Sequence, residues 1–430
     1  MNSRSLFFAP IAAAGVIGLC GLGEAPPVPA RPGSPLGAVE ARAPIPEDLR
    51  PAAASLVEGS NAFALDLYRS LSAEPGNLIF SPFSVSAALA MAYAGAAGET
   101  RNEMTRVMHI DPRDLRLHEA WEAVLAGVRG TDRAGPVVRV ANRLWGQRGH
   151  HFLDGFLSVT RRRYGAELEA LDFAGAPAAA RETIDAWTAK ATGGKWPHVL
   201  PAPLDPLTVL VITNAIYFRA LWTDPFDPRA TYDEPFHLAS GEDVTVRLMH
   251  GMSRFRYGEM PDGTKLVELP YDGRELSMLV VLPPAPAAGS TGLEGIERAV
   301  SFDQVRRWIE SLSSEEVSVA LPRFRMESSL DLAPTLSALG MPAAFDAGRA
   351  EFSGMTADQV FISHVYHGAF VDVTERGTEA GAATHVAVVE SAEEVGRFKE
   401  FRADRPFLFL IRDDAAGSIL FIGRLADPRD

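Results

Sequence analysis

The chain has 430 residues, of which 47% are hydrophobic, and this is enough for a large core and for two or three domains. It carries 41 Lys and Arg against 55 Asp and Glu, a net charge of −14, which argues against nucleic acid or an anionic membrane surface as partner. The single cysteine, Cys20, lies outside the expected folded region, so the domain is predicted to contain no disulfide.

Residues 1–23 are predicted to be an export signal. Arg4 forms a basic start and Leu6–Gly23 is an uncharged apolar run. The sequence "IGLC" resembles a bacterial lipobox that would lipidate Cys20, although Leu19 stands where a small residue is usual. A plain cleaved signal and an uncleaved anchor stay open as alternatives. All three predict a secreted or envelope-tethered protein, and the lipobox would be typical of a bacterial source.

The next segment, residues 24–52, is predicted to be a tether. It is rich in Pro, Ala, Gly and Arg, a composition that cannot bury enough apolar surface to form a core. No comparable low-complexity break or repeat follows in residues 53–430.

Helices are predicted near the start of this region. Phe63, Leu67 and Leu71 recur at spacings of four, which places them on one face of a helix. A second helix is predicted to begin with Ser81 as N-cap and Pro82 at its first position. Its body is apolar on all sides, so we expect it to be buried.

Strands are predicted later in the region. The β-branched run Leu207–Phe218 is typical of a central strand buried on both faces. The segment 361–373 alternates, and one face carries Phe361, Val365, Ala369, Val371 and Val373, with His367 among them. Residues 406–425 form two apolar runs around an Asp/Ala/Gly turn, which predicts a hairpin. Helices followed by strands, without regular βαβ alternation, indicate an α+β fold with a mixed sheet.

The sequence contains no recognisable catalytic or metal-binding motif, such as G-x-S-x-G, H-E-x-x-H or C-x-x-C. His364 and His367 lie three apart in a predicted strand, so their rings would point to opposite faces and could not easily share an ion. His150 and His151 are predicted to lie in a loop. The prediction is therefore a protein that is not an enzyme, with no metal and no cofactor.

Several blocks in a consistent order resemble the serpin family of serine protease inhibitors, over about residue 53 to the C-terminus. They are "NLIFSPFSVSAALAMAYAGAAGETRNEM" (Asn77–Met104), "TNAIYFRALW" (Thr213–Trp222), "VELPY" (Val267–Tyr271), "FISHVYHGAFVDVTERGTEAGAAT" (Phe361–Thr384) and "FRADRPFLFLIRD…FIGRLADP" near the C-terminus. The resemblance implies one α+β domain with three β-sheets and eight or nine helices. It also implies a monomer with an exposed reactive-centre loop at about residues 375–400.

In this family, a serine protease attacks the loop as a substrate and forms an acyl-enzyme. The cut loop then inserts into the main sheet as a new strand and traps the protease covalently. The resemblance assigns the hinge of this loop to Glu375, Arg376, Gly377, Thr378, Glu379, Ala380, Gly381, Ala382, Ala383 and Thr384.

Every second residue of the predicted hinge from Thr378 onward is uncharged, as a strand that inserts into a buried sheet requires. The alternate set that starts at Thr378 is small or β-branched and uncharged: Thr378, Ala380, Ala382, Thr384, Val386 and Val388. Alternate residues of a strand face the same side, so this set can be buried without burying a charge. Arg376 shares the parity of Thr378 and would face inward if insertion began that early. It is the main argument for the alternative of a non-inhibitory binding, chaperone or storage protein.

The bond attacked stays ambiguous. The family's usual spacing from Gly377 gives Ser391–Ala392, whereas counting back from the closing block gives Val395–Gly396. Small and β-branched neighbours such as Val389 suit an elastase-like or subtilisin-like protease, and cleavage at Glu390–Ser391 would suit a glutamate-specific one.

Further residues carry over from the family by position. Ser81, Ser84, Asn214 and His367 match its polar cluster under the centre of the sheet, here called the shutter. Trp222 and Glu375 match the site where insertion starts, here called the breach. The resemblance implies that His367 is a structural hydrogen-bonding residue and that no catalytic residue is present.

Overall fold

The computed structural model describes residues 43–128, 136–191, 194, 200, 204–285, 292–378 and 398–429. The predicted signal, Cys20 and most of the predicted tether lie outside these residues. Within the described residues, Glu47–Leu49 form a 3-10 turn and the first helix begins at Arg50. None of the described helices is long and apolar enough to cross a bilayer.

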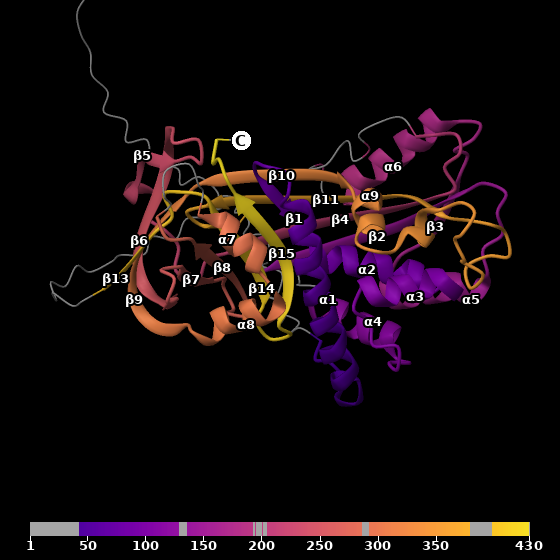
Figure 1. Cartoon of the computed structure of the whole chain (residues 1–430), viewed down its shortest axis with the longest axis horizontal. Coiled ribbons are helices and arrows are strands. Elements are labelled where there is room, and N and C mark those ends of the chain that lie inside the picture. The colour runs from indigo at the N-terminus through magenta and orange to yellow at the C-terminus, as the bar shows by residue number, and fades with distance from the viewer. Residues whose placement is uncertain are drawn as a thin grey trace, which may run out of the picture. The chain divides into compact units, whose positions relative to one another are not determined.

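Nine α-helices lie in the described residues, in agreement with the expected eight or nine (Figure 1). They are α1 (Arg50–Leu71), α2 (Pro82–Tyr93), α3 (Gly98–Val107), α4 (Leu117–Val128), α5 (Asp154–Val159), α6 (Pro177–Ala191), α7 (Leu293–Ala299), α8 (Phe302–Glu310) and α9 (Ala333–Ala338).

The helix α2 confirms its prediction in detail. Every residue of Pro82–Tyr93 is buried, as the apolar sequence requires. The hydroxyl of Ser81 accepts a hydrogen bond from the backbone N–H of Ser84 at 3.2 Å and so caps the first turn. Because the helix is buried, the polar groups of Ser81 and Ser84 must find partners inside the protein.

A six-stranded sheet contains both strands that the sequence places at its centre. Its order is β10 (Phe324–Asp331), β11 (Ile362–Thr374), β12 (Gly377–Thr378), β4 (Leu210–Leu221), β2 (Val137–Gln147) and β3 (Leu168–Leu171). Helices α2 and α6 cover opposite faces of it, since Ile212 belongs to the main core with α2 and the adjacent Val211 to a second cluster with Ile184 of α6. This double cover explains the continuous apolar run of β4.

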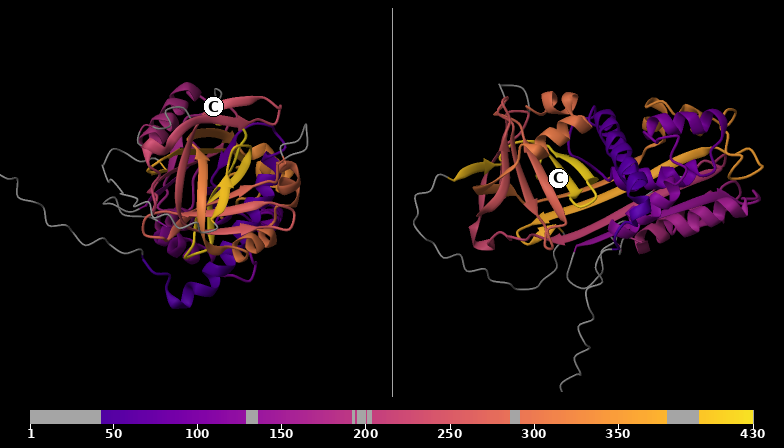
Figure 2. Two further views of the ribbon diagram at one scale, coloured as in Figure 1. Left: turned by 90° about the vertical axis from the view of Figure 1, so that its left-hand side faces the viewer. Right: turned by 90° about the horizontal axis from the view of Figure 1, so that it is seen from below.

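The other nine strands form one hydrogen-bonded sheet. They are β1 (Leu78–Phe80), β5 (Thr231–His237), β6 (Asp243–Glu259), β7 (Lys265–Pro270), β8 (Leu276–Leu282), β9 (Ser313–Pro322), β13 (Lys399–Arg402), β14 (Phe407–Asp413) and β15 (Ser418–Leu425). The strands β14 and β15 are the predicted hairpin. Figures 1 and 2 show these strands gathered at one end of the long strands β4, β10 and β11.

Two of the three expected sheets are thus joined. The strand β6 is 17 residues long, and its first half pairs with β5 while its last residues pair with β7. The neighbouring β9 pairs with β6 through both halves, from Leu248 to Tyr257. Hydrogen bonding therefore continues from one of these expected sheets into the other.

Candidate functional site

The candidate site is the seam between β4 (Leu210–Leu221) and β11 (Ile362–Thr374) in the six-stranded sheet. The N-terminal ends of β4 and β11 form one end of the seam, here called the lower end. From there the two strands pair directly and in parallel, from Leu210↔Ile362 to Ile216↔Ala369. At their C-terminal ends, here called the upper end, β12 lies between them and is antiparallel to both. Gly377 pairs with Leu221 and Thr374, and Thr378 pairs with Ala220 and Val373. The first two residues of the strand that is expected to insert therefore already occupy a strand position.

Gly377 is required where β12 enters the seam. Its φ angle is +150°, and a Cβ at this position would lie 2.1 Å from the carbonyl oxygen of Ala220. A backbone oxygen cannot move aside as a flexible side chain can, so a larger residue would separate β12 from β4.

Thr378 is fully buried and its hydroxyl lies 2.8 Å from the hydroxyl of Tyr271. Tyr271 is also fully buried. Its ring stacks on Trp222, with centroids 4.5 Å apart and planes 9° apart, and meets Phe218 edge-on at 5.1 Å. Burial raises the pKa of Tyr271 far above its usual range, so its phenol is neutral and can donate or accept. Tyr271 was not predicted as a site residue, although it closes the "VELPY" block.

Trp222 holds the turn that leads into β12. Its indole N–H donates to the carbonyl of Thr374 at 3.0 Å, and its backbone N–H donates to the carbonyl of Arg376 at 2.9 Å. The family resemblance predicts a role for Trp222 at the start of insertion, and in the structure the residue lies beside the first residues of β12.

Glu375 is buried in the same turn. Its carboxylate accepts a hydrogen bond from the hydroxyl of Thr231 at 3.0 Å and lies 3.6 Å from the guanidinium of Arg323. Its carbonyl accepts from the backbone N–H of Phe226 at 2.8 Å. A buried carboxylate needs such partners, because an unpaired one would strongly disfavour the folded state.

Arg376 lies between Glu375 and Gly377 and is only half-buried. The strand β12 begins one residue later, at Gly377, so Arg376 belongs to the turn and not to the inserted strand. An inward Arg376 was expected only if the inserted strand began that early, and in this structure the chain reverses between Thr374 and Gly377. The main sequence argument against insertion is thereby weakened.

The shutter closes the middle of the seam. The hydroxyl of Ser84 donates to the side-chain oxygen of Asn214 at 2.7 Å, and the Asn214 amide donates back to the carbonyl of Ser84 at 2.9 Å. The same amide also donates to the side chain of Asn142 on β2, a residue that the sequence did not single out. The cluster therefore ties β2, β4 and the start of α2 together.

His367 completes the shutter from β11. Its Nε2 accepts the backbone N–H of Ser81 at 2.9 Å, so the proton sits on Nδ1, which donates to the side-chain oxygen of Asn214. Burial lowers the pKa of His367 to about 3, because the charged ring would have no water around it. The ring is therefore a neutral, hydrogen-bonded group in the folded protein. His367 and Asn214 are also register partners, so their hydrogen bond crosses the seam itself.

The remaining histidines match their predictions. His364 is partly exposed, with Nδ1 2.7 Å from the carboxylate of Asp331, whereas His367 is fully buried. His150 and His151 lie outside regular structure. Within the described ranges, no group of three His, Cys, Asp or Glu side chains could hold a metal ion.

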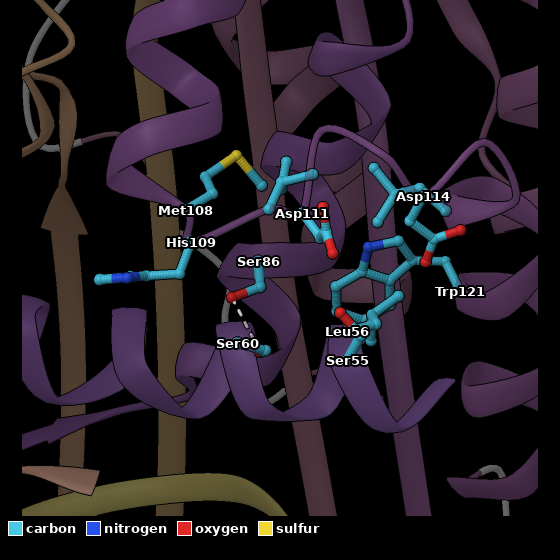
Figure 3. A pocket seen from close by; sticks show the side chains of 11 residues that line it. Ser55, Leu56, Ser60, Ser86, Met108, His109, Asp111, Asp114 and Trp121 are labelled. Carbon is cyan, nitrogen blue, oxygen red and sulfur yellow. Dashed lines mark hydrogen bonds between the residues drawn. The ribbon is translucent and has the colours of Figure 1, made fainter. Parts of the chain in front are cut away.

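A small cavity lies away from the seam, between α1 and α4 (Figure 3). Its volume is about 20 Å³, and the hydrogen bond between the hydroxyls of Ser60 and Ser86 lies beside it. The ring of His109 points away from it in Figure 3. This volume suits about one water molecule and does not form a substrate site.

The rest of the predicted loop lies outside the described residues. This applies to the hinge positions Glu379, Ala380, Gly381, Ala382, Ala383 and Thr384, and to Val389, Glu390, Ser391, Ala392 and Val395 around the scissile bond. Their roles stay predictions from the sequence.

Comparisons with a family model, with related sequences and with solved structures all match this chain to serpins. A family model described as "Serpin (serine protease inhibitor)" matches residues 58–428. The leukocyte elastase inhibitor of Bos taurus is 41% identical over 380 residues, which covers 87% of this chain and 99% of that protein. The leukocyte elastase inhibitor of Homo sapiens is 39% identical over the same length and the same shares. The crystal structure of uncleaved ovalbumin has a TM-score of 0.79 and 30% identity, and the match covers 87% of this chain and all of that one.

Proposed function

Because the chain belongs to the serpin family, we propose that it is a suicide-substrate inhibitor of serine proteases with elastase-like or subtilisin-like specificity. Its partner is the target protease, which it holds in a covalent complex as a monomer. The relatives named as leukocyte elastase inhibitors support the protease class. The observation that carries the proposal is β12, the start of a strand placed between β4 and β11.

The proposed reaction begins as ordinary proteolysis. The protease serine attacks the carbonyl carbon of Ser391, and the bond to Ala392 breaks as the new amine of Ala392 takes a proton from the protease histidine. The protease is left as an ester on Ser391. If the loop then inserts before water attacks, the protease is carried away from the geometry that deacylation requires.

The seam supplies the driving force for insertion. A strand that continued from β12 would replace the parallel pairing of β4 and β11 by antiparallel pairing on both of its sides. Antiparallel ladders are slightly more stable per residue than parallel ones. About ten new backbone hydrogen bonds at about 1 kcal/mol each would favour insertion by on the order of 10 kcal/mol.

The test is incubation of the purified chain with pancreatic elastase, subtilisin, a glutamyl endopeptidase and trypsin. We expect a band at the summed mass that survives denaturation, with a released fragment that starts at Ala392. A fragment that starts at Ser391 or Gly396 would move the scissile bond to one of the alternatives. Clean cleavage by every protease, without an adduct and without a gain in heat resistance, would instead support the non-inhibitory binding or storage protein.

We also propose that the protein is exported, and either secreted or held at the cell envelope through a lipid on Cys20. The support is the basic and apolar start of the chain and its lipobox-like "IGLC". The two elastase inhibitors compared are mammalian, so the bacterial source rests on the lipobox alone. Fractionation of expressing bacteria with the wild type and Cys20→Ser tests this: loss of the protein from the membrane fraction only in the variant supports lipidation.

A further inference from the structure

We propose that Tyr271 is a positioning residue for loop insertion. Its hydroxyl holds Thr378 between β4 and β11, so that the cleaved loop extends an existing strand and does not have to start a new one. This inference rests on the proposed function, since it concerns the insertion step of that same reaction.

The first residues of an inserted strand are the hardest to place. They must separate the neighbouring strands and give up backbone freedom before the rest of the ladder forms. In this protein β12 has already met that requirement, with Gly377 and Thr378 paired on both sides. What keeps β12 in this position therefore influences how fast insertion can begin.

Tyr271 is suited to hold it because its own position does not depend on the hinge. Its backbone N–H donates to the carbonyl of Leu276 at 2.9 Å, and its carbonyl accepts from the hydroxyl of Thr223 at 2.9 Å. Its ring is fixed by Trp222 on one face and by Phe218 at its edge. The phenol therefore presents its hydroxyl at a fixed point beside the entrance of the seam.

The hydrogen bond to Thr378 is the side-chain link between this fixed group and β12. Both hydroxyls are fully buried and lie 2.8 Å apart. Trp222 binds the backbone of the preceding turn, at Thr374 and Arg376, and does not hold Thr378 itself through these bonds. Loss of the hydroxyl pair would leave the turn in place and leave Thr378 held by its backbone pairing alone.

A merely structural role makes a different prediction. Removing one of two buried hydroxyls leaves the other without a partner, which destabilises the fold, whereas removing both together is nearly neutral. If the pair only satisfies buried polar atoms, the double variant should behave like the wild type. If the pair positions the hinge, the double variant should remain defective in insertion although its stability recovers.

The experiment compares five forms of the full chain: the wild type, Tyr271→Phe, Thr378→Val, the double variant, and Thr378→Ser as the control that keeps the hydroxyl. Each is mixed with the protease that the wild type traps, and the ratio of cleaved inhibitor to covalent complex is measured. Thermal unfolding of the uncut forms is measured in parallel. A hydrogen bond of this kind corresponds to about a fivefold change in an equilibrium or rate.

We expect this ratio to rise about fivefold in Tyr271→Phe, Thr378→Val and the double variant alike, and to stay unchanged in Thr378→Ser. The unfolding temperature should fall in the two single variants and return toward the wild-type value in the double variant. A double variant with the wild-type ratio would overturn the inference, and so would single variants whose ratio does not change.

Failure of the proposed function is distinguishable from failure of this inference. If the cut wild type forms no adduct but gains heat resistance, insertion stands and the panel lacked a protease that the chain traps. The same five forms are then compared by the rate at which the cut chain gains heat resistance, with about fivefold slower gain expected for the three defective forms. If the cut wild type gains no heat resistance, the loop does not insert and both proposals are overturned.

Discussion

The two ends of one seam are held in different ways. At the upper end β4 and β11 are already separated, and β12 fills the space beside a stack of aromatic rings. In the middle the same strands pair directly, and buried polar side chains from α2, β2, β4 and β11 hold them together. The separation of β4 and β11 can therefore start at the upper end, whereas the side-chain hydrogen bonds in the middle oppose it.

The difference follows from which interactions each region would lose when a strand enters. At the upper end a new strand extends β12 and leaves the Trp222–Tyr271 stack intact. In the middle it must break the hydrogen bond between His367 and Asn214, which are register partners across the seam. Buried polar groups that lose their hydrogen-bond partners destabilise the protein. We therefore expect β4 and β11 to stay paired at the shutter until an entering strand forms new hydrogen bonds with them.

The largest expected effect comes from removing the ring in the middle of the seam. His367→Ala would leave a cavity and take partners from Ser81 and Asn214, so we expect the free energy of unfolding to fall by about 3–5 kcal/mol. Thermal and urea unfolding measure this, and size-exclusion chromatography detects chains joined through opened sheets. His364→Ala, on the same strand but partly exposed, is the control and should lower it by about 1 kcal/mol or less. If the two variants lowered the free energy of unfolding equally, the hydrogen bonds of the shutter would contribute no more to stability than an exposed side chain does.

Acid should weaken the middle of the seam. His367 has a pKa of about 3 in the folded state against about 6.5 when unfolded. The unfolded chain therefore binds a proton that the folded chain does not, and stability is lost as pH falls from about 6.5 toward 3. The loss from this group reaches on the order of 4 kcal/mol near pH 3.5.

Other groups also titrate in this range, His118 and Asp414 among them, and must be separated from His367. Burial lowers the pKa of His118 to about 4, which adds to the acid loss, and raises the pKa of Asp414 to about 6, which opposes it. Urea unfolding against pH for the wild type and His367→Gln isolates the contribution of His367. If the free energy of unfolding changed with pH equally in both proteins between pH 6.5 and 4, His367 would not be the group that loses stability in acid.

A substitution at Gly377 should act on the upper end alone. Gly377→Ala places a Cβ against the carbonyl of Ala220 and at an unfavourable positive φ, so we expect β12 to leave the seam with a loss of about 1–3 kcal/mol. Hydrogen exchange at Thr378, followed by mass spectrometry, should become faster. Gly149→Ala is the matched control, because its φ is also positive at +101° but nothing lies within 4 Å of its Cβ. Unchanged exchange at Thr378 would contradict the docked position of β12.

The smallest effect is expected at the solvent-exposed side of the breach. Arg323 lies 3.6 Å from the carboxylate of Glu375, but its side chain is 47% exposed. Arg323→Ala should therefore lower the free energy of unfolding by less than about 1 kcal/mol. Thr231→Val removes a buried donor from the same carboxylate and should have the larger effect, about 1–2 kcal/mol. The reverse order in urea unfolding would show that the ion pair matters more than the buried hydrogen bond.

Much of the fold could be predicted from local patterns. The cap and buried body of α2, the continuous apolar run of β4 and the closing hairpin each follow from residues next to one another in the chain. The resemblance to a family added the shutter and breach residues, and the described ones meet in the seam. Asn142 and Tyr271 were missed because each becomes important only through a partner far away in sequence.

The sequence by itself determined that a small-residue strand follows β11 and that its alternate residues are uncharged. It could not determine where that strand starts, and an inward position of Arg376 therefore stayed open, conditional on a strand that begins before Gly377. That start depends on the turn held by Trp222 and on the space beside Ala220, which only the tertiary structure decided. The physical reason is that a strand's register is set by what its backbone pairs with, and the partners of β12 on β4 lie more than 150 residues earlier in the chain.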